Sequence, residues 1–438
     1  MNTLIITLRT HFHNFLCLSE AKGMAIIMDK RIKKIKLAVI GAGGRGNAYS
    51  KYVHNHPAEV ELVAVADPDE KRRSEFATEY NIPEEMRFHD WDTFFEQPKM
   101  ADAVLICTQD QQHYTPAIKA MEMGYDVLLE KPMSPNEKEC KEIAECSERT
   151  GRTLAICHVL RYTSFFKKLK ELLDEGRVGQ LVSMHLSENI AYWHFSHSYV
   201  RGAWRNKELS SPIILAKSCH DMDILYWLVG AKCKNISSFG NLVQFKAENA
   251  PEGAPARCSD GCPASDSCLY YAPNMYVHME HSWLSTANRS QDNIDQVLED
   301  LKTSQYGRCV YRCDNNVPDH MVTALEFENG VTGTFNLCAY TNECFRQIRL
   351  MGTLGEISGD MEKDEIRVID FSTGNTETIN LMKSTAGHGG GDEGIMESFI
   401  ASLRAGSAAL TNGNESLHSH LMAFAAEESR VTGKTINV

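Results

Sequence analysis

The stretch AKSCHDMD, residues 216–223, places a lysine, a cysteine, a histidine and two aspartates within eight positions. Such side chains can bind a metal, transfer protons, or simply begin a helix. Ser218 is followed three residues later by Asp221, as in a capping box, and Gly230 suits the end of a helix. We therefore predict a helix between Ser218 and Gly230. Three apolar residues at helical spacing are expected to face the core: Met222, Leu225 and Val229.

His220 falls in the first turn of this expected helix. The positive end of the helix dipole disfavours a protonated imidazole there, so the ring should be neutral and able to accept a proton at pH 7. Asp223, one turn later, could orient the ring. Consecutive helix residues point in different directions, which makes joint metal binding by Cys219, His220 and Asp221 the weaker interpretation. A purely structural helix start is the remaining alternative.

A glycine-rich turn follows the first apolar run of the chain. The sequence IKLAVIGAGGRG combines a strand-like segment with the spacing Gly41-x-Gly43-x-x-Gly46, and a helix-like segment comes next. Gly41 permits a tight turn, Gly43 lets the backbone approach a pyrophosphate, and Gly46 lets the helix pack closely on the strand. This order predicts a dinucleotide-binding βαβ unit whose helix N-terminus faces the phosphates.

Asp67 ends a second apolar run, 21 positions beyond Gly46. A carboxylate at this place accepts hydrogen bonds from the ribose hydroxyls and repels a 2′-phosphate, so NAD is favoured over NADP. Arg72 and Arg73 moderate that preference. Further cofactor contacts are expected at the glycine turn and at the carboxyl ends of later strands, from Gly44, Arg45, Thr108, Gln109, His113, Glu130, Lys131 and Arg161.

Strand-like and helix-like segments alternate from residue 35 to residue 162. Repeated units of this length specify a doubly wound parallel sheet, a Rossmann domain, which we place at residues 34–157. Later segments, such as residues 321–340 with the turn sequence ENG, read as hairpin strands. We therefore expect an α/β protein whose second domain, residues 158–438, contains a large and mostly antiparallel sheet, followed by two helices.

The segments AVIGAGGRG, ADPD and DAVLICTQDQQHYTPAIKAMEMGYDVLLEKP resemble the glucose–fructose oxidoreductase / inositol dehydrogenase (Gfo/Idh/MocA) family of NAD(P)-dependent oxidoreductases. The resemblance implies that Lys131 lies near the nicotinamide ribose and the substrate hydroxyl, and that the Lys131–Pro132 bond is cis. It also implies proton transfer by His220. The family commonly has an acid four positions before this histidine, whereas this chain has Ala216, so Lys217 is predicted to join Lys131 near the reacting hydroxyl.

The resemblance implies an NAD-dependent dehydrogenase acting on a secondary hydroxyl of a sugar, glycoside or cyclitol. An NAD-dependent glycosidase that works by transient oxidation is the alternative. Aromatic faces suit the C–H faces of sugars, and Arg or His donors suit their hydroxyls. The segment AYWHFSHSYVRGAWRN and the glycine loop at residues 388–394 are accordingly expected to supply substrate contacts: His194, His197, Arg201, Trp204 and Asp392.

A cysteine-rich insert at about residues 246–313 interrupts the second domain. A tight Cys-x-x-x-Cys with a third cysteine nearby and a remote pair could complete a structural zinc site. The expected ligands are Cys258, Cys262, Cys268 and Cys309, with Cys313 as an alternative. Separate reduced thiols, disulfides and an iron–sulfur cluster remain open as other interpretations.

The composition limits the possible partners. The 438 residues carry a net charge of −13, which argues against nucleic acid as the main partner, and the apolar runs are too short to span a membrane. We expect a cytoplasmic homo-oligomer, a dimer or tetramer, that acts on a small molecule. Residues 1–33 read as an N-terminal extension that we expect to be disordered. Because Met28 precedes a natural enzyme start, residues 1–27 are either a stretch upstream of the true start codon or a disordered tail.

Overall fold

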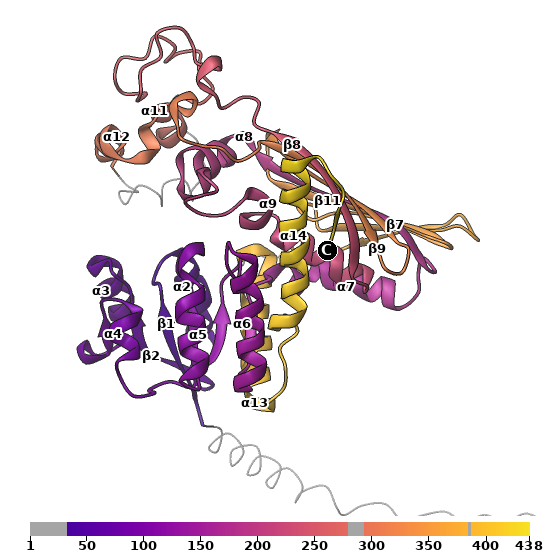
Figure 1. Ribbon diagram of the computed structural model, residues 1–438, viewed down its shortest axis with the longest axis horizontal. Coiled ribbons are helices and arrows are strands. Elements are labelled where there is room, and N and C mark those ends of the chain that lie inside the picture. Colours follow the sequence, from indigo (N-terminus) through magenta and orange to yellow (C-terminus); the bar gives the residue numbers. More distant parts are fainter. Residues whose placement is uncertain (1–32, 279–292, 384–386) are drawn as a thin grey trace, which may run out of the picture.

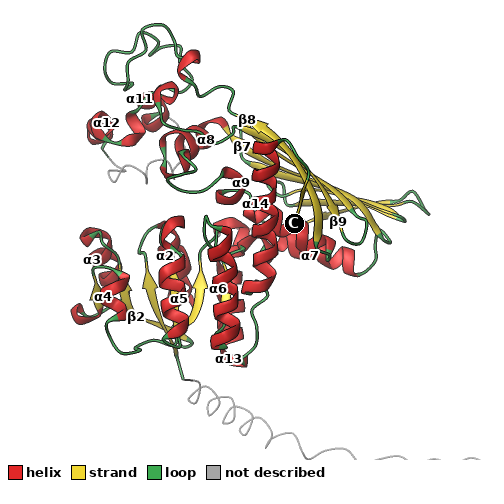
Figure 2. Ribbon diagram, in the orientation of Figure 1, coloured by secondary structure: helices red, strands yellow, loops and turns green. Residues whose placement is uncertain are grey.

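The computed structural model describes residues 33–278, 293–383 and 387–438. The chain forms two sheets with helices packed against them, and the two sheets lie in different parts of the molecule (Figure 2). The prediction of a disordered extension concerns residues 1–33, and nearly all of that range lies outside the described residues. In the described part of the chain, no helix is both long and apolar enough to cross a membrane.

The first sheet is the predicted doubly wound sheet. Its six strands are all parallel, in the order β3-β2-β1-β4-β5-β6. The strands are β1 Ile35–Ile40, β2 Val60–Ala66, β3 Arg87–Phe88, β4 Ala103–Ile106, β5 Asp126–Leu129 and β6 Leu154–Ile156. The helices between them are α2 Gly44–Asn55, α3 Glu70–Glu79, α4 Trp91–Phe95, α5 Tyr114–Glu122 and α6 Glu137–Thr150. Every residue of the central strand β4 is buried, as expected for a parallel sheet covered on both faces.

One boundary differs from the prediction. Residues 152–162 were expected to form a single strand, but β6 ends at Ile156 and residues Val159–Tyr162 form a 3₁₀ turn. The apolar pattern continues through both parts because Val159 and Leu160 are buried as well. Periodicity alone cannot separate a short buried strand from a buried turn of this kind.

The second sheet has nine strands in the order β14-β13-β12-β11-β7-β10-β9-β8-β15. All of its pairs are antiparallel except β7 with β10, so the prediction of a mostly antiparallel sheet is confirmed. The ENG turn joins β9 to β10 and has Gly330 in the left-handed region, with φ 84°. The strands are β7 Leu181–Ala191, β8 Cys233–Asn241, β9 His320–Phe327, β10 Thr332–Thr341, β11 Phe345–Gly352, β12 Gly355–Asp360, β13 Glu365–Asp370, β14 Thr376–Asn380 and β15 Ile436–Asn437.

The last two helices connect the two parts of the molecule. Helix α13 packs against the first sheet, because its Ile395 and Phe399 share a buried cluster with Leu37 and Val39. Helix α14 lies beside α6 of the first domain and β8 of the second sheet (Figure 1). The other helices of this part are α7 Ser164–Asp174, α8 Tyr192–Phe195, α9 Ile213–Ala216, α10 Cys219–Val229, α11 Ala272–Val277 and α12 Ile294–Thr303, with α13 Gly391–Ala405 and α14 Gly413–Thr432 at the end.

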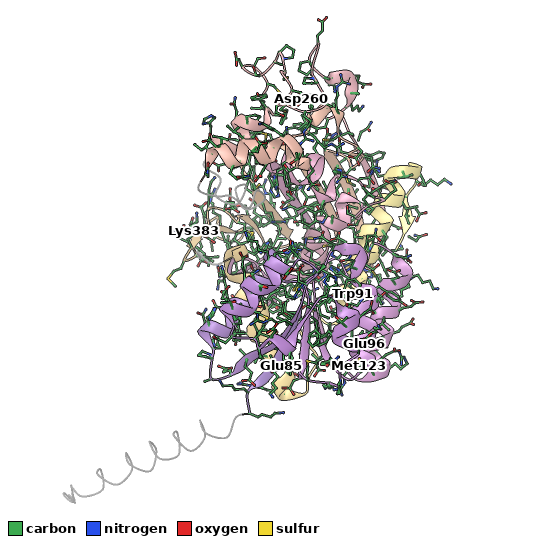
Figure 3. The ribbon with its side chains drawn as sticks, turned by 90° about the vertical axis from the view of Figure 1, so that its left-hand side faces the viewer. Glu85, Trp91, Glu96, Met123, Asp260 and Lys383 are labelled. Atoms are coloured by element: carbon green, nitrogen blue, oxygen red, sulfur yellow. The ribbon has the colours of Figure 1, made fainter. Side chains whose placement is uncertain are left out.

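The cysteine-rich insert lies between β8 and β9 and contains the short helices α11 and α12. Asp260 marks the insert at one end of the molecule in Figure 3, and Glu85 and Met123 mark the opposite end, in the nucleotide domain. The insert therefore extends the second domain and does not cover the far edge of the first.

Candidate active site

The glycine turn has the geometry that a dinucleotide requires. Gly41 has φ 95°, and a Cβ built on it would lie 2.6 Å from the carbonyl oxygen of Cys107. A Cβ on Gly46 would lie 2.2 Å from the Gly41 oxygen, whereas Gly43 and Gly44 have no atom within 4 Å of that position. The turn is thus closed on the side of the sheet and open beside the start of α2, where a pyrophosphate would meet backbone N–H groups.

Asp67 lies at the end of β2, where the prediction placed it. Its carboxylate is buried and accepts hydrogen bonds from the backbone N–H groups of Ala42, at 2.9 Å, and Asp69, at 2.8 Å. Arg72 pairs with the same carboxylate at 3.2 Å. These bonds hold Asp67 beside the glycine turn, which is the position that a ribose-binding carboxylate needs.

Arg45, in the glycine turn, joins three segments that are far apart in the sequence. Its guanidinium donates to Glu130 at 2.7 Å and to Asp392 at 2.6 Å, and it also contacts the Tyr49 hydroxyl at 2.6 Å. Burial alone would raise the pKa of Glu130 and Asp392, but Arg45 and the hydrogen bonds around it lower the pKa of both carboxyls. Both groups are therefore ionised, and Asp392, predicted as a substrate contact, is engaged by the cofactor turn.

The turn after β5 presents the expected lysine. The Lys131–Pro132 peptide bond is cis. His113 contacts the carbonyl oxygens of Pro132, at 2.6 Å, and Thr108, at 3.1 Å, so it lies between the ends of β4 and β5. The Lys131 ammonium donates to the Ala216 carbonyl oxygen at 2.9 Å. This contact brings Lys131 to the segment that precedes His220, where the family usually has an acid.

Helix α10 begins and ends where the sequence predicted. Ser218 is its N-cap and Gly230, with φ 67°, is its C-cap. The expected capping box is wrong, because the Ser218 side chain makes no capping hydrogen bond and Asp221 binds Arg346 at 2.7 Å. The expected role of Asp223 is also wrong, because its carboxylate accepts two 2.7 Å hydrogen bonds from the buried Arg161. This ion pair with Arg161 engages the Asp223 carboxylate, so that it does not orient His220, and it compensates the charge of the buried Arg161.

His220 is buried and belongs to a row of histidine rings. Its ring centroid lies 6.0 Å from that of His158 and 6.2 Å from that of His388. Burial, followed by the charge of Lys131, lowers the pKa of His220 well below its ordinary value. The sequence also predicted a neutral ring at pH 7, but from the helix dipole, whereas in the structure burial is the main cause. Lys131 therefore lies close enough to influence the His220 ring, and the neutral imidazole can accept a proton.

Lys217 has a carboxylate partner that the sequence did not reveal. Its ammonium lies 3.0 Å from Glu188 of β7, and Arg346 of β11 lies 2.7 Å from both Glu188 and Asp221. Two cations thus alternate with two carboxylates between α10 and the second sheet. The pairing with Glu188 holds Lys217 at the sheet, where it borders the predicted substrate region.

The predicted substrate residues divide into two groups. Trp204 donates to Asp110, just after β4, at 3.3 Å, and His194 contacts the Cys344 sulfur, just before β11, at 3.2 Å. His197 and Arg201 instead face the insert. His197 contacts the Tyr276 hydroxyl at 2.9 Å, and Arg201 is fully buried. Substrate contacts by these residues remain predictions.

The cysteine cluster surrounds Arg201. The guanidinium donates to the carbonyl oxygens of Arg308 and Tyr270, and it lies 3.8 Å from the Cys258 sulfur. Burial raises the pKa of three thiols that a zinc site would need as thiolates: Cys268, Cys309 and Cys313. Among the residues that the structure describes, no three His, Cys, Asp or Glu side chains are placed to hold a metal ion. The structure thus gives the zinc prediction no support.

Several residues of the site were not identified from the sequence. Asp110 follows β4 and accepts a 2.7 Å hydrogen bond from Ser211. Glu188 and Arg346 lie in strands that read only as alternating apolar and polar positions. His158 follows β6 in an apolar run. Asp110 and His158 had a detectable signal, since both follow the carboxyl end of a parallel strand, where ligands bind in such sheets.

The open glycine turn beside Asp67, with Lys131 near a neutral buried histidine, is the arrangement expected of a dinucleotide-dependent oxidoreductase. The sequence profile of the oxidoreductase family with an NAD-binding Rossmann fold (Gfo/Idh/MocA) matches residues 35–158, and the profile of its C-terminal α/β domain matches residues 170–438. The chain therefore belongs to this family.

Two similar proteins and one solved structure match different lengths of this chain. It is 22% identical to the putative oxidoreductase YteT of Bacillus subtilis over 389 residues, which is 83% of this chain and 88% of YteT. It is 28% identical to the scyllo-inositol 2-dehydrogenase (NAD(+)) of the same species over 210 residues, which covers 48% of this chain but only 58% of that enzyme. The levoglucosan dehydrogenase solved in complex with NADH shares the fold, with TM-score 0.71 at 17% identity, over 93% of this chain and 99% of that one.

Proposed function

We propose that this oxidoreductase uses NAD to oxidise a secondary hydroxyl of a sugar, glycoside or cyclitol. The observation that supports it most is the approach of Lys131 to the segment that carries His220. The two come from different domains, and the Lys131 ammonium reaches the Ala216 carbonyl four positions before His220. The named relatives include inositol and levoglucosan dehydrogenases, which act on hydroxyls of this class.

The residues at the glycine turn fit a dinucleotide. The open positions at Gly43 and Gly44 would admit the pyrophosphate, and Asp67 would bind the adenosine ribose. Bound NAD supplies the hydride acceptor for the oxidation of a C–H bond. Because the Asp67 carboxyl would lie beside the site of a 2′-phosphate and would disfavour it, NAD is the proposed cofactor in preference to NADP.

The chain's own residues handle the hydroxyl and its proton. The Lys131 ammonium, held by the Ala216 carbonyl, would donate a hydrogen bond to the substrate oxygen and stabilise negative charge that develops there. The neutral His220 imidazole would accept the hydroxyl proton. Burial of His220 keeps it unprotonated at neutral pH, so the base is ready before the substrate binds.

The test is turnover of a panel of sugars, glycosides and cyclitols with NAD, followed as NADH formation. Wild type should oxidise at least one of them. His220→Gln should lower kcat by about 10²–10⁴, as expected for loss of a general base, and Lys131→Met should lower it comparably. Lys138→Met, a lysine whose side chain is 83% exposed on α6, is the matched control and should retain full activity. No oxidation of any member, and no reduction of the corresponding ketones by NADH, would refute the proposal.

A further inference from the structure

His388 lies just before the start of α13. It lies in a turn whose backbone is left-handed at three successive residues, His388 at φ 48°, Gly389 at 61° and Gly390 at 86°. Its ring centroid is 6.2 Å from that of His220. This separation is too long for a direct hydrogen bond, but one intervening oxygen, from water or a substrate hydroxyl, would connect two such rings.

Asp392 fixes the protonation pattern of the His388 ring. The Asp392 carboxylate lies 3.0 Å from Nδ1 of His388 and also binds Arg45. Because the hydrogen bonds from His388 and Arg45 outweigh burial, the pKa of Asp392 is lowered and the group is an acceptor only. The 3.0 Å contact with this acceptor is shorter than the 3.5 Å contact of Nδ1 with the Arg45 donor, so it favours the hydrogen of a neutral His388 on Nδ1 and leaves a lone pair on Nε2. A carboxylate that orients an imidazole in this way is a common feature of proton-transferring histidines.

His220 has no comparable support. Its Nδ1 atom is buried without a hydrogen-bond partner among the described residues, and Asp223, on its own helix, is bound to Arg161. Buried polar atoms are normally hydrogen-bonded, so this nitrogen is available to a further hydrogen-bonding group. His220 can therefore accept a proton but has no carboxylate of its own to stabilise the charged ring.

Oxidation of an alcohol by NAD releases one proton per turnover, and that proton must reach water. The C–H bond breaks and its electron pair leaves as hydride to the nicotinamide; the O–H bond breaks and its pair forms the carbonyl π bond. His220 is only 6% exposed, whereas the side chain of His388 is 43% exposed. His388 thus combines nearness to the buried base with access to solvent.

We propose that His388, oriented by Asp392, carries the proton from His220 to bulk water. This inference rests on the proposed dehydrogenase function. The proton passes from the substrate oxygen to His220, then through one bridging oxygen to Nε2 of His388, and then to water or buffer. The charged groups that face His388 are Asp392 of α13 and Arg45 of α2, with the ring of His220 from α10; Asp392 offsets the charge that His388 gains while Arg45 opposes it.

The test is chemical rescue. His388→Ala should lower kcat by at least about tenfold, within the range for lost proton transfer, while the KM for substrate changes little. At constant pH and ionic strength, added imidazole should then raise kcat of the variant in proportion to its concentration and leave wild type unchanged. His54→Ala, whose side chain is 51% exposed on α2, is the matched control and should show neither the loss nor the rescue.

Three results would overturn the relay. One is an unchanged kcat in His388→Ala; another is a loss of kcat that no concentration of imidazole restores. The third does not depend on activity. It is a ¹⁵N NMR spectrum that shows the hydrogen of neutral His388 on Nε2 in wild type and that is unchanged in Asp392→Asn. Absence of any wild-type turnover would instead refute the dehydrogenase function and the relay with it, so the two failures are distinguishable.

Discussion

His420 connects the stability of the chain to the geometry of the catalytic turn. It is fully buried on α14, its Nε2 accepts the Met133 N–H at 2.9 Å, and its Nδ1 lies 2.7 Å from the Ser416 carbonyl oxygen. Both contacts require a neutral ring with its hydrogen on Nδ1. Met133 comes two residues after Lys131, so protonation of His420 would break a bond that holds the turn carrying the lysine.

The size of the effect follows from linkage. Burial, together with the nearby His158 ring, lowers the pKa of His420 to about 3. The unfolded chain has a histidine pKa of about 6.5, so the unfolded state binds more protons below that pH. The stability that His420 contributes is therefore present above pH 6.5 and is lost as the pH falls towards 3. Between pH 7.5 and pH 5 the loss is about 2 kcal/mol.

His420→Gln tests this reasoning, since a glutamine oxygen can still accept the Met133 N–H but cannot titrate. Urea unfolding at pH 7.5 and pH 5 should show wild type losing about 2 kcal/mol more than the variant across this interval. His54→Gln, an exposed histidine, should keep the wild-type pH dependence. Equal losses for wild type and His420→Gln would refute the assignment of a strongly lowered pKa to His420.

Three further perturbations address the pairs around the site. Asp223→Asn should lower the free energy of unfolding by about 3–5 kcal/mol, because it leaves the charge of the buried Arg161 unpaired. The double variant Asp223→Leu with Arg161→Met should recover most of this free energy in urea titrations. No recovery would contradict the explanation. Glu188→Gln removes the carboxylate that compensates the charge of Lys217. The ratio of kcat/KM for a uronic acid to kcat/KM for its neutral sugar should then rise about tenfold, equivalent to ~1.4 kcal/mol. An unchanged ratio would show that Lys217 does not act on the substrate. Asp67→Ser should raise the kcat/KM ratio of NADP over NAD by about tenfold or more, because the carboxylate that repels the 2′-phosphate is gone, and steady-state kinetics with both cofactors would detect a failure to shift.

Local signals predicted the elements of the fold well. The glycine spacing, the β-branched runs and Gly230 each act through backbone conformation or alternation within a few residues, so they can be read without knowing what lies across the molecule. The parallel, doubly wound character of the first sheet and the bounds of α10 follow from them. The strand predicted through residue 162 was too long, because burial on all sides removes the periodicity that distinguishes a strand from a turn.

The partners of the charged residues could not be predicted in the same way. Asp221 and Asp223 lie on one short helix, yet one binds Arg346, 125 positions away, and the other binds Arg161, 62 positions away. Which carboxylate pairs with which arginine depends on how segments far apart in the sequence pack together, and nothing in the local sequence encodes it. The same limitation explains why Lys217 was predicted without Glu188.

The loop after β4 has a consequence for engineering within the family. Asp110 binds Trp204 and Ser211, and Gln111 donates to the Ser210 carbonyl at 2.8 Å, so a loop of the nucleotide domain forms part of the wall of the second domain. A chimera that joins this second domain to the Rossmann domain of a relative would separate these partners. Such a graft should therefore carry the loop with the second domain, and the boundary between interchangeable parts lies inside the first domain.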